Sequence, residues 1–507
     1  MTAAPAGAAV PATPNTPATS TQPTVVPAGP SIVIDPSVAR PFARQLLGTN
    51  VPAWLNPYRL NDETFISRTT DLGLSLLRMP GGSWSNAYAW ADCETGGEDC
   101  YWPWAAKPSD FLRFARAVNA EIIWTVSING SAQEAAALVA FFNGSVNDER
   151  AIGVDSRGRD WQTVGHWARL RAEVVSAEPF PVRYWEIGNE VYGAKREVGA
   201  NCAEWGWEDV WTCDADEYLR GATFAGVKYD GYLAFYDAMK AVDPSIQIGA
   251  VGVEKPADWN DWGNRVIAGA GEKLDFYIIH YYPYFQPPEN PAGALQQPQR
   301  SWAQIMADLR AAFDRHLGRQ VPVAVTEYNL VSFQDLDNAQ LMRRAVNLLF
   351  IADTIGQMAV NGVAIANQWD LANGRAANGT DYGLLDADTF APNPPYYALM
   401  LWSQFGDELL NVQTSFDPAK TLSVYAGRRA DGALTLLVIN KTDKPLAATI
   451  VLPEDGWQMT ALVAGASDLL AETVSLNQLE TPVVVTSADY VYTFAPFAAT
   501  LLTFTSP

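Results

Sequence analysis

The sequence has few histidines and cysteines, few basic residues and no long apolar run. With 3 His and 4 Cys in 507 residues, and no Cys-x-x-Cys pair, it does not predict a metal site. Lys and Arg total 34 against 56 Asp and Glu, so the formal net charge is −22, and neither nucleic acid nor an anionic membrane is expected as a partner. No stretch reaches the roughly 18 apolar residues of a membrane-spanning helix. A neutral substrate fits this composition better than a charged one.

The cysteines fall in two close pairs, Cys93 with Cys100 and Cys202 with Cys213, each within polar loop sequence. Two local disulfides are predicted, with buried free thiols as the alternative, and disulfides indicate an oxidising compartment. No signal peptide is visible, and residues 1–30 form an Ala-, Pro- and Thr-rich leader that is predicted to be disordered. We therefore expect a secreted, extracellular protein.

Apolar strands alternate with helical segments through residues 45–408. The composition, 48% hydrophobic and 18% charged, is that of a globular protein with more than one domain. Eight strands are predicted, at Leu46–Val51, Leu76–Met79, Ile122–Ile128, Arg183–Glu190, Ile246–Val251, Phe276–Tyr282, Val321–Asn329 and Val363–Asp370. A helical segment follows each strand, including a long helix near Glu217–Val242. This alternation predicts an α/β fold, the parallel (β/α)8 TIM barrel. An open doubly wound sheet is the alternative, but no Gly-x-Gly-x-x-Gly follows the first strand, and no cofactor is expected.

From about Leu410 the pattern changes to short strands separated by turns, such as Leu422–Ala426 and Ala433–Ile439. Repeated strands of this kind predict a C-terminal antiparallel β-sandwich over residues 409–507. A strand within residues 31–44 could join it. Nothing catalytic stands out in the sandwich, so we expect it to serve packing, with sugar binding as the lesser alternative.

Two of the barrel strands end on a glutamate. The fourth ends on Asn189 and Glu190, and the seventh ends on Thr326 and Glu327. Active sites of such barrels lie at the C-terminal ends of the strands, and cleavage of a glycosidic bond requires a pair of carboxylates. The alternative for either glutamate is a solvated loop charge. Other strand ends carry residues suited to holding a substrate, namely Arg78, Asn129, His280 and Trp369.

These motifs resemble clan A of the glycoside hydrolases, the retaining TIM-barrel enzymes, over roughly residues 45–405. That clan carries an Asn-Glu acid/base on strand four and a nucleophilic Glu on strand seven. Within it, the segments Arg78–Gly82, Ser127–Gly144, Ile187–Glu190 and His280–Tyr282 are similar to family 51, the α-L-arabinofuranosidases. Ser83 stands where that family has a sugar-binding Asn, and Thr326–Asn329 instead resembles family 44, the endoglucanases and xyloglucanases, and related families such as 39.

The resemblance implies a double displacement in which Glu327 attacks the anomeric carbon and Glu190 acts first as an acid and then as a base. Asn189 would donate a hydrogen bond to the 2-hydroxyl of the sugar. Arg78 would hold Glu327 ionised, with a structural ion pair inside the barrel as the alternative. Tyr282 would donate to Glu327, with Tyr281 as the lesser alternative.

The remaining candidates would line the sugar subsite. His280 and Trp369 are placed there by the resemblance, with a core histidine and simple packing as the alternatives. Asn129 is a further substrate-binding candidate. Glu186 lies four residues before Glu190, hence on the same strand face, and is interpreted as a buried structural carboxylate.

The expected function is a retaining glycoside hydrolase on plant cell-wall-type polysaccharide, with α-L-arabinofuranosidase-like activity. An endo-acting β-glucanase, xyloglucanase or xylanase on the same fold is the alternative. A non-catalytic carbohydrate-binding protein is the alternative from another class. Tryptophan-rich loops around both cysteine pairs favour a cleft for a polymer chain, so the expected partner is a neutral poly- or oligosaccharide. The oligomeric state is left open.

Overall fold

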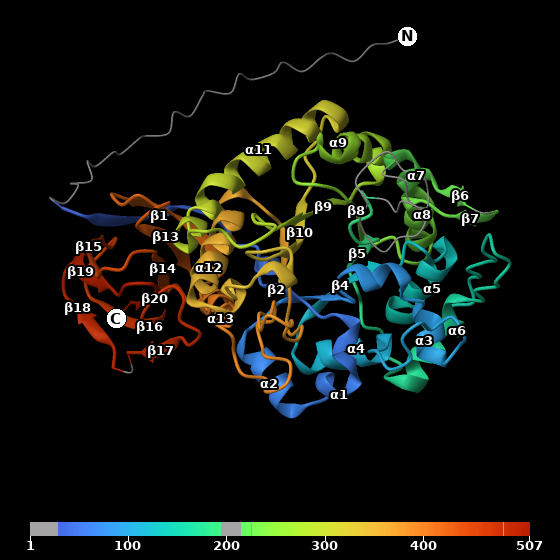
Figure 1. The fold of residues 1–507 in the computed structure, drawn as a ribbon, viewed down its shortest axis with the longest axis horizontal. Helices are drawn as coiled ribbons and strands as arrows, with labels where there is room; N and C mark the ends of the chain where they lie inside the picture. The colour runs from blue at the N-terminus through green and yellow to red at the C-terminus, as the bar shows by residue number, and fades with distance from the viewer. Residues whose placement is uncertain (1–28, 194–213, 225, 480, 507) are drawn as a thin grey trace, which may run out of the picture.

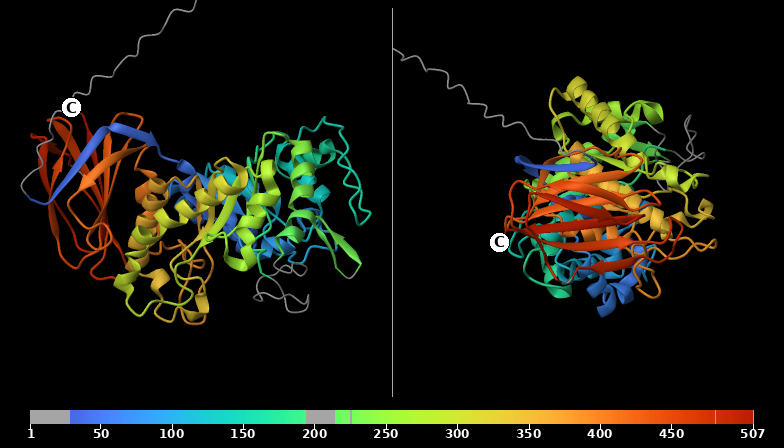
Figure 2. Two further views of the ribbon diagram at one scale, coloured as in Figure 1. Left: turned by 90° about the horizontal axis from the view of Figure 1, so that it is seen from above. Right: turned by 90° about the vertical axis from the view of Figure 1, so that its left-hand side faces the viewer.

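Eight parallel strands close into a barrel, and a ten-stranded sheet lies to one side of it, against two of the outer helices (Figures 1 and 2). The computed structural model describes residues 29–193, 214–224, 226–479 and 481–506. Around the barrel the strands follow one another as β10 (Val323–Tyr328), β11 (Ile365–Gln368), β2 (Gly48–Asn50), β3 (Leu76–Met79), β4 (Glu121–Val126), β5 (Tyr184–Ile187), β8 (Gln247–Val251) and β9 (Phe276–Tyr281). The predicted TIM barrel is confirmed.

Helices surround the barrel on its outside (Figure 1). The longer ones are α2 (Glu63–Asp71), α4 (Pro108–Ala117), α5 (Ala132–Asn143), α6 (Val164–Val174), α8 (Tyr232–Val242), α9 (Asp258–Ala270), α11 (Gln297–Leu317), α12 (Ala345–Asn361) and α13 (Tyr396–Ser403). Shorter helices are α1 (Asn56–Leu60), α3 (Trp90–Thr95), α7 (Ala215–Arg220) and α10 (Pro291–Ala294). Among the described residues, no helix combines the length and the apolar character needed to span a bilayer.

The barrel strands are apolar on both faces because each face meets a different core. Leu76, Ile123 and Ile278 belong to a small cluster made of strand residues alone, which fills the barrel interior. Their neighbours, such as Leu77 and Ile122, pack into the large core beneath the helices. Side chains two residues apart share a face, so Arg78 points into the barrel above Leu76.

The predicted long helix near Glu217–Val242 is wrong. Helix α7 ends at Arg220, a hairpin of β6 (Ala222–Phe224) and β7 (Val227–Tyr229) follows, and α8 begins at Tyr232. Gly221 explains the break, because its φ of +86° is incompatible with a right-handed helix. A Cβ at this position would lie 2.3 Å from the carbonyl oxygen of Tyr229, so glycine is required there.

The C-terminal strands form one hydrogen-bonded sheet that wraps around its own apolar core. Its strands are β1 (Ser31–Pro41), β12 (Glu408–Thr414), β13 (Leu422–Arg428), β14 (Leu434–Asn440), β15 (Leu446–Val451), β16 (Trp457–Gly465), β17 (Ser475–Gln478), β18 (Val483–Val485), β19 (Asp489–Phe494) and β20 (Ala498–Thr505). The long β1 pairs antiparallel with β12 and parallel with β15, and so joins the two layers. The enclosed core includes Ile32, Leu436, Ile450 and Phe504.

A buried ion pair joins the sheet to the barrel. Lys441, which directly follows β14, places its Nζ 2.6 Å from Oδ2 of Asp353 on α12, and both side chains are at most 2% exposed. Tyr425 on β13 donates to the other oxygen of Asp353, at 2.5 Å. The ring of Tyr425 also covers Gly356, where a Cβ would lie 2.2 Å from it. The sheet therefore packs on α12 through a specific polar contact as well as apolar surface.

Candidate active site

The two predicted glutamates meet above the C-terminal ends of β5 and β10. Strict alternation from the inward-facing Ala324 would turn Glu327 away from the barrel interior, because the two are an odd number of residues apart. The register of β10 shifts between Val325 and Glu327, so that Glu327 pairs with His280. An irregularity of this kind re-aims a side chain, and here it brings Glu327 inward.

Glu327 is buried and is held by two hydrogen-bond donors. Nη1 of Arg78 lies 2.7 Å from its Oε1, and the hydroxyl of Tyr282 donates to its Oε2 at 2.9 Å. The predicted contacts of Arg78 and Tyr282 with Glu327 are therefore both present. Each of the two carboxylate oxygens accepts a hydrogen bond from one of these donors, which fixes the orientation of the group.

Arg78 is fully buried and contacts four acceptors. Besides Glu327, its guanidinium donates to Oδ1 of Asn50 at 2.9 Å and to Oδ1 of Asn189 at 2.7 Å, and its Nε donates to Glu186. Arg78 thus contacts the candidate nucleophile and also forms a buried ion pair with Glu186. Asn189 presents its remaining amide group near Ser83, whose Oγ lies 3.4 Å from Nδ2.

Glu186 is a buried structural carboxylate, as the strand periodicity predicted. Its side chain is 0% exposed, and Oε1 accepts from both Arg78 and the hydroxyl of Thr125. Among the described residues, Oε2 of Glu186 has no hydrogen-bond partner. A buried carboxylate with an unsatisfied oxygen is costly, and the charge of Arg78 offsets that cost.

His280 bridges the two candidate catalytic glutamates. Its Nδ1 lies 2.7 Å from Oε1 of Glu190 and 3.6 Å from Oε2 of Glu327, and its Nε2 is 3.1 Å from the hydroxyl of Thr326. Glu190 is reached through Gly188, whose φ of +81° turns the chain at the end of β5. The sequence analysis placed His280 in the subsite, and its contact with Glu190 was not foreseen.

These contacts set the proton affinities of the site. Burial alone would raise the pKa of Glu190, but the hydrogen bond and charge of His280 outweigh burial and hold that pKa below its ordinary value. Burial raises the pKa of Glu327, against the opposing charges of His280 and Arg78. Burial would lower the pKa of His280, yet the charges of Glu327 and Glu190 raise it. The opposite pKa shifts of Glu190 and His280 have the same cause, the close contact of an imidazole with two carboxylates.

The same three residues have the spacing of metal ligands. Ligand atoms of Glu190, His280 and Glu327 all lie within 4.8 Å of one another. However, Arg78 already places a positive charge 2.7 Å from Oε1 of Glu327, and that charge repels a cation at the same position. The donor set therefore fits a pair of acid–base carboxylates better than a metal centre.

The ring of Trp369 lies against Gly82, whereas the backbone of Asn129 is bonded to Arg157. Trp369 is 8% exposed, and its ring covers Gly82, where a Cβ would lie 2.4 Å from the ring. Asn129 is not joined to the Arg78 network by any hydrogen bond among the described residues. Its Oδ1 is buried without a partner there, and its carbonyl oxygen accepts from Arg157 at 2.6 Å.

Two positioning residues were missed by the sequence analysis. Asn50, at the end of β2, donates to the carbonyl oxygens of Thr326 and Gln368, both at 3.0 Å, and accepts from Arg78. Because Asn50 is a polar residue within a predicted apolar strand, the sequence could have indicated that its side chain has a specific role. Asn86 holds the backbone of Asn189 by accepting from its amide at 2.9 Å and donating to its carbonyl at 2.8 Å. Nothing in the loop sequence indicated this contact.

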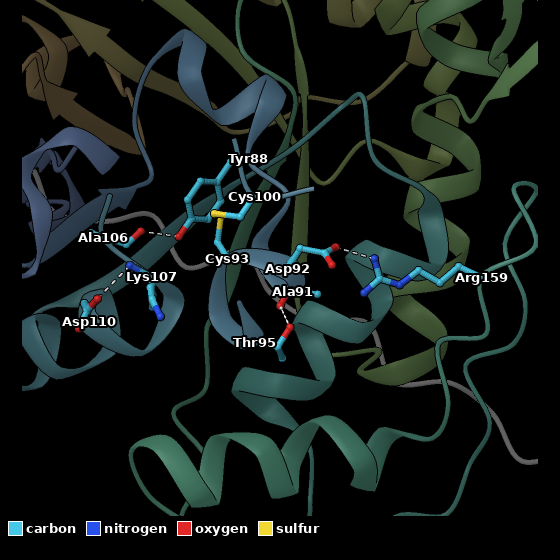
Figure 3. Close-up of a disulfide and its surroundings, with 10 residues drawn as sticks. All are labelled: Tyr88, Ala91, Asp92, Cys93, Thr95, Cys100, Ala106, Lys107, Asp110 and Arg159. Carbon is cyan, nitrogen blue, oxygen red and sulfur yellow. Dashed lines mark hydrogen bonds and ion pairs between the residues drawn. A yellow bond between two sulfur atoms is a disulfide. The ribbon is translucent and has the colours of Figure 1, made fainter. Parts of the chain in front are cut away.

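One of the two predicted disulfides is present. Cys93 and Cys100 are bonded in the loop region after β3 (Figure 3), whereas Cys202 and Cys213 lie outside the described residues.

No family model matches the chain. In sequence, 232 residues are 25% identical to an intracellular exo-α-(1→5)-L-arabinofuranosidase of Halalkalibacterium halodurans. The match covers 42% of this chain and 37% of the relative, so the chain spans well under half the length of that protein.

These relatives contradict the prediction of a secreted, extracellular protein. The protein from Halalkalibacterium halodurans and a second relative from Bacillus subtilis, also 25% identical over 42% of this chain, are intracellular arabinofuranosidases. That prediction rests on two disulfides and on the Ala-, Pro- and Thr-rich leader. The Cys93–Cys100 bond closes a separation of 7 residues, which needs only local proximity of the two thiols and is weak ground for assigning a compartment.

Solved structures are similar over nearly the whole chain. The family 51 α-L-arabinofuranosidase of Thermotoga petrophila RKU-1 has a TM-score of 0.72 at 21% identity, and the match covers 94% of this chain and 100% of that one. A family 44 xyloglucanase of Paenibacillus polymyxa has a TM-score of 0.60 at 16% identity, with coverages of 94% and 100%. The predicted resemblance to families 51 and 44 is confirmed, and by fold the chain is similar to these clan A glycoside hydrolases.

Proposed function

We propose that this protein is a retaining glycoside hydrolase in which Glu327 is the nucleophile and Glu190 is the acid and base. The observation that carries the proposal is the spacing of the two carboxylates, since one oxygen of each lies within 4.8 Å of the other. Retaining glycosidases hold their carboxyl groups about 5–5.5 Å apart, whereas inverting enzymes need roughly 6.5–9.5 Å to admit a water molecule.

In the first step, an oxygen of Glu327 bonds to the anomeric carbon while the bond to the leaving oxygen breaks. Glu190 gives its proton to that leaving oxygen, and a glycosyl–enzyme intermediate results. Arg78 and Tyr282 orient the attacking carboxylate and stabilise it again when it departs. In the second step Glu190 takes a proton from water, and the water oxygen displaces Glu327 with overall retention.

His280 is the proton source beside Glu190, whose own pKa is held below its ordinary value. With every group ionised, Arg78 and His280 carry two positive charges against the three negative charges of Glu186, Glu190 and Glu327. Passing the His280 proton to Glu190 removes one positive and one negative charge from this buried cluster and leaves its net charge unchanged. His280 Nδ1, at 2.7 Å from Glu190, is placed to supply the proton as the leaving oxygen develops charge.

The proposed substrate is a plant cell-wall-type polysaccharide from which α-L-arabinofuranosyl units are removed. The intracellular arabinofuranosidases matched in sequence support this choice of sugar. Internal cleavage of a β-linked backbone is the second candidate, and the match to a xyloglucanase over 94% of this chain favours it.

Glu327→Gln tests the nucleophile, because Gln keeps the shape of the side chain but carries no charge. Hydrolysis of every glycan should fall to background while sugar binding stays near normal. Glu178→Gln, which changes an exposed glutamate on the surface, is the matched control and should behave as the wild type. Turnover at the wild-type rate in Glu327→Gln would remove Glu327 from its role. A wild type that binds glycans and hydrolyses none would leave a carbohydrate-binding protein.

Glu190→Ala tests the acid and base. Aryl glycosides with good leaving groups need little protonation, so they should still form the glycosyl–enzyme intermediate, and azide should restore turnover by replacing the activated water. The azide product should retain the configuration of the substrate, as determined by NMR. An inverted product contradicts the double displacement.

The size of the products decides between the two substrates. Arabinoxylan, xyloglucan and mixed-linkage glucan are incubated with the protein, and the products are separated by chromatography. Free arabinose as the only product supports side-chain removal, whereas oligosaccharides without monosaccharide support backbone cleavage.

A further inference from the structure

Aromatic rings lead away from Trp369 in an unbroken series of contacts. Trp54 lies beside Trp369 with ring centroids 6.0 Å apart and the planes inclined at 67°, and Trp84 meets Trp54 at 5.1 Å in the same edge-to-face manner. Trp54 and Trp84 come from the segments after β2 and β3 respectively. Both segments follow C-terminal strand ends, so the series begins on the face of the barrel that carries Glu190 and Glu327.

The series continues outward and ends in exposed rings. Trp84 stacks on Trp102 at 3.9 Å with an interplanar angle of 9°, and it also contacts Trp104 edge-on at 5.8 Å. Tyr101 packs edge-on against Trp102 at 4.8 Å. Trp104 is 53% exposed and Tyr101 is 73% exposed. We call the six rings from Trp369 to Tyr101 the aromatic path.

The loop that carries the outer rings is tied down at several points (Figure 3). The Cys93–Cys100 disulfide closes it just before Tyr101. The hydroxyl of Tyr88 donates to the carbonyl oxygen of Ala106 at 2.5 Å, and Asp92 pairs with Arg159 at 2.6 Å. Rings that are already fixed lose little conformational entropy when a ligand covers them, so exposed aromatics here are preorganised for binding.

The chemistry of this surface selects a neutral, ring-shaped ligand. Exposed tryptophan and tyrosine rings present flat apolar faces, and the C–H groups on the face of a sugar ring pack on such a face. Glu98 and Asp99 are exposed immediately before Cys100, and their charges repel a polyanion. Single exposed aromatic residues are ordinary, but this is a connected series that starts at Trp369, whose backbone amide donates to Tyr328, the residue after Glu327.

We propose that the aromatic path binds an extended neutral polysaccharide chain, with sugar units beyond the cleaved bond stacking on Trp104 and Tyr101. This inference rests on the proposed function for the position of the cleaved bond. It adds a distal binding surface, so the protein should distinguish a polymer from a small glycoside that cannot reach the outer rings.

The test compares polymer with small substrate in Trp104→Ala, Tyr101→Ala and the double variant. For arabinoxylan and xyloglucan, the KM should rise on the order of three- to tenfold per ring removed, the range expected for one aromatic contact. For 4-nitrophenyl α-L-arabinofuranoside, or the aryl glycoside that the wild type cleaves fastest, the rise should be several times smaller. Tyr58→Ala is the matched control, because Tyr58 is 80% exposed and lies outside the aromatic path.

Equal losses on polymer and aryl glycoside would overturn the inference and leave the proposed function intact. So would an equal loss on polymer in Tyr58→Ala. If the wild type hydrolyses no glycan, the proposed function fails, and affinity electrophoresis of the same variants in gels containing xyloglucan or arabinoxylan still tests the path. Binding to the polysaccharide slows migration of the protein through the gel. Slowed migration that is lost in the double variant and kept in Tyr58→Ala supports the aromatic path. Migration of the double variant that is slowed as much as that of the wild type overturns it.

Discussion

His280 is hydrogen-bonded to Glu190, with Nδ1 2.7 Å from Oε1. The contact links the candidate acid to a histidine, and the neighbouring carboxylates raise the pKa of that histidine above its ordinary value, against the effect of burial. The proton needed for the first step is therefore retained at a pH where a lone carboxyl group has lost it.

His280→Gln should shift the pH dependence of kcat/KM. In the wild type the alkaline limb reports loss of the proton shared by His280 and Glu190, whereas in the variant it reports Glu190 alone. Because an ordinary glutamate titrates about two units below an ordinary histidine, the limb should move to lower pH by about one unit or more. His316→Gln, at an exposed position on α11, is the control. An unchanged alkaline limb in His280→Gln would show that the proton is not shared.

Glu186→Gln should weaken catalysis because Glu186 is connected to Glu327 through Arg78. Removing its charge leaves Arg78 to act on Glu327 more strongly, which lowers the pKa of the nucleophile and makes it less reactive. We expect kcat to fall about tenfold and the acidic limb of the profile to move to lower pH. Glu121→Gln, on the exposed start of β4, is the control. A loss of kcat with an unmoved acidic limb would instead indicate a packing role.

Asp381 should make the protein less stable as the pH rises. Burial raises its pKa to about 6, with the charge of Asp386 adding to the shift. The folded state therefore binds more protons than the unfolded state between about pH 4 and pH 6, and the free energy of unfolding falls over that window. Asp381→Asn should remove a loss on the order of 2–3 kcal/mol. Urea denaturation at pH 4 and pH 7 measures it, and an equal pH effect in the wild type and the variant contradicts the assignment.

Lys441→Met should strongly destabilise the protein, because it leaves the charge of Asp353 buried without a counter-ion. Removing one partner of a buried pair costs about 3–5 kcal/mol. Adding Asp353→Asn to this variant removes the orphaned charge and should recover part of the loss. The midpoint of urea denaturation for the four proteins of the cycle gives the coupling. Additive effects of the two substitutions would show that the pair is not coupled.

The barrel could be predicted from the sequence because its signals are local. Strands such as Ile122–Ile128 are apolar on both faces, and their ends carry Arg78, His280 and the two glutamates. The hairpin between Ala222 and Tyr229 was missed although Gly221, Gly226 and Gly231 interrupt the helical pattern there, because the apolar residues on either side were read as one helix. Helical propensity over a window is a weak guide where a single backbone angle decides the outcome.

By itself, the sequence determined which side chains reach the C-terminal face of the barrel, because strand length and apolar periodicity place the strand ends. Only the tertiary structure decided how those side chains pair. The register shift in β10 turned Glu327 toward Arg78, the closure of the barrel brought His280 between Glu190 and Glu327, and the loops after β2 and β3 joined Trp54 to Trp84. These partners lie far apart along the chain, and contacts at such separations depend on how the whole barrel closes rather than on any local pattern.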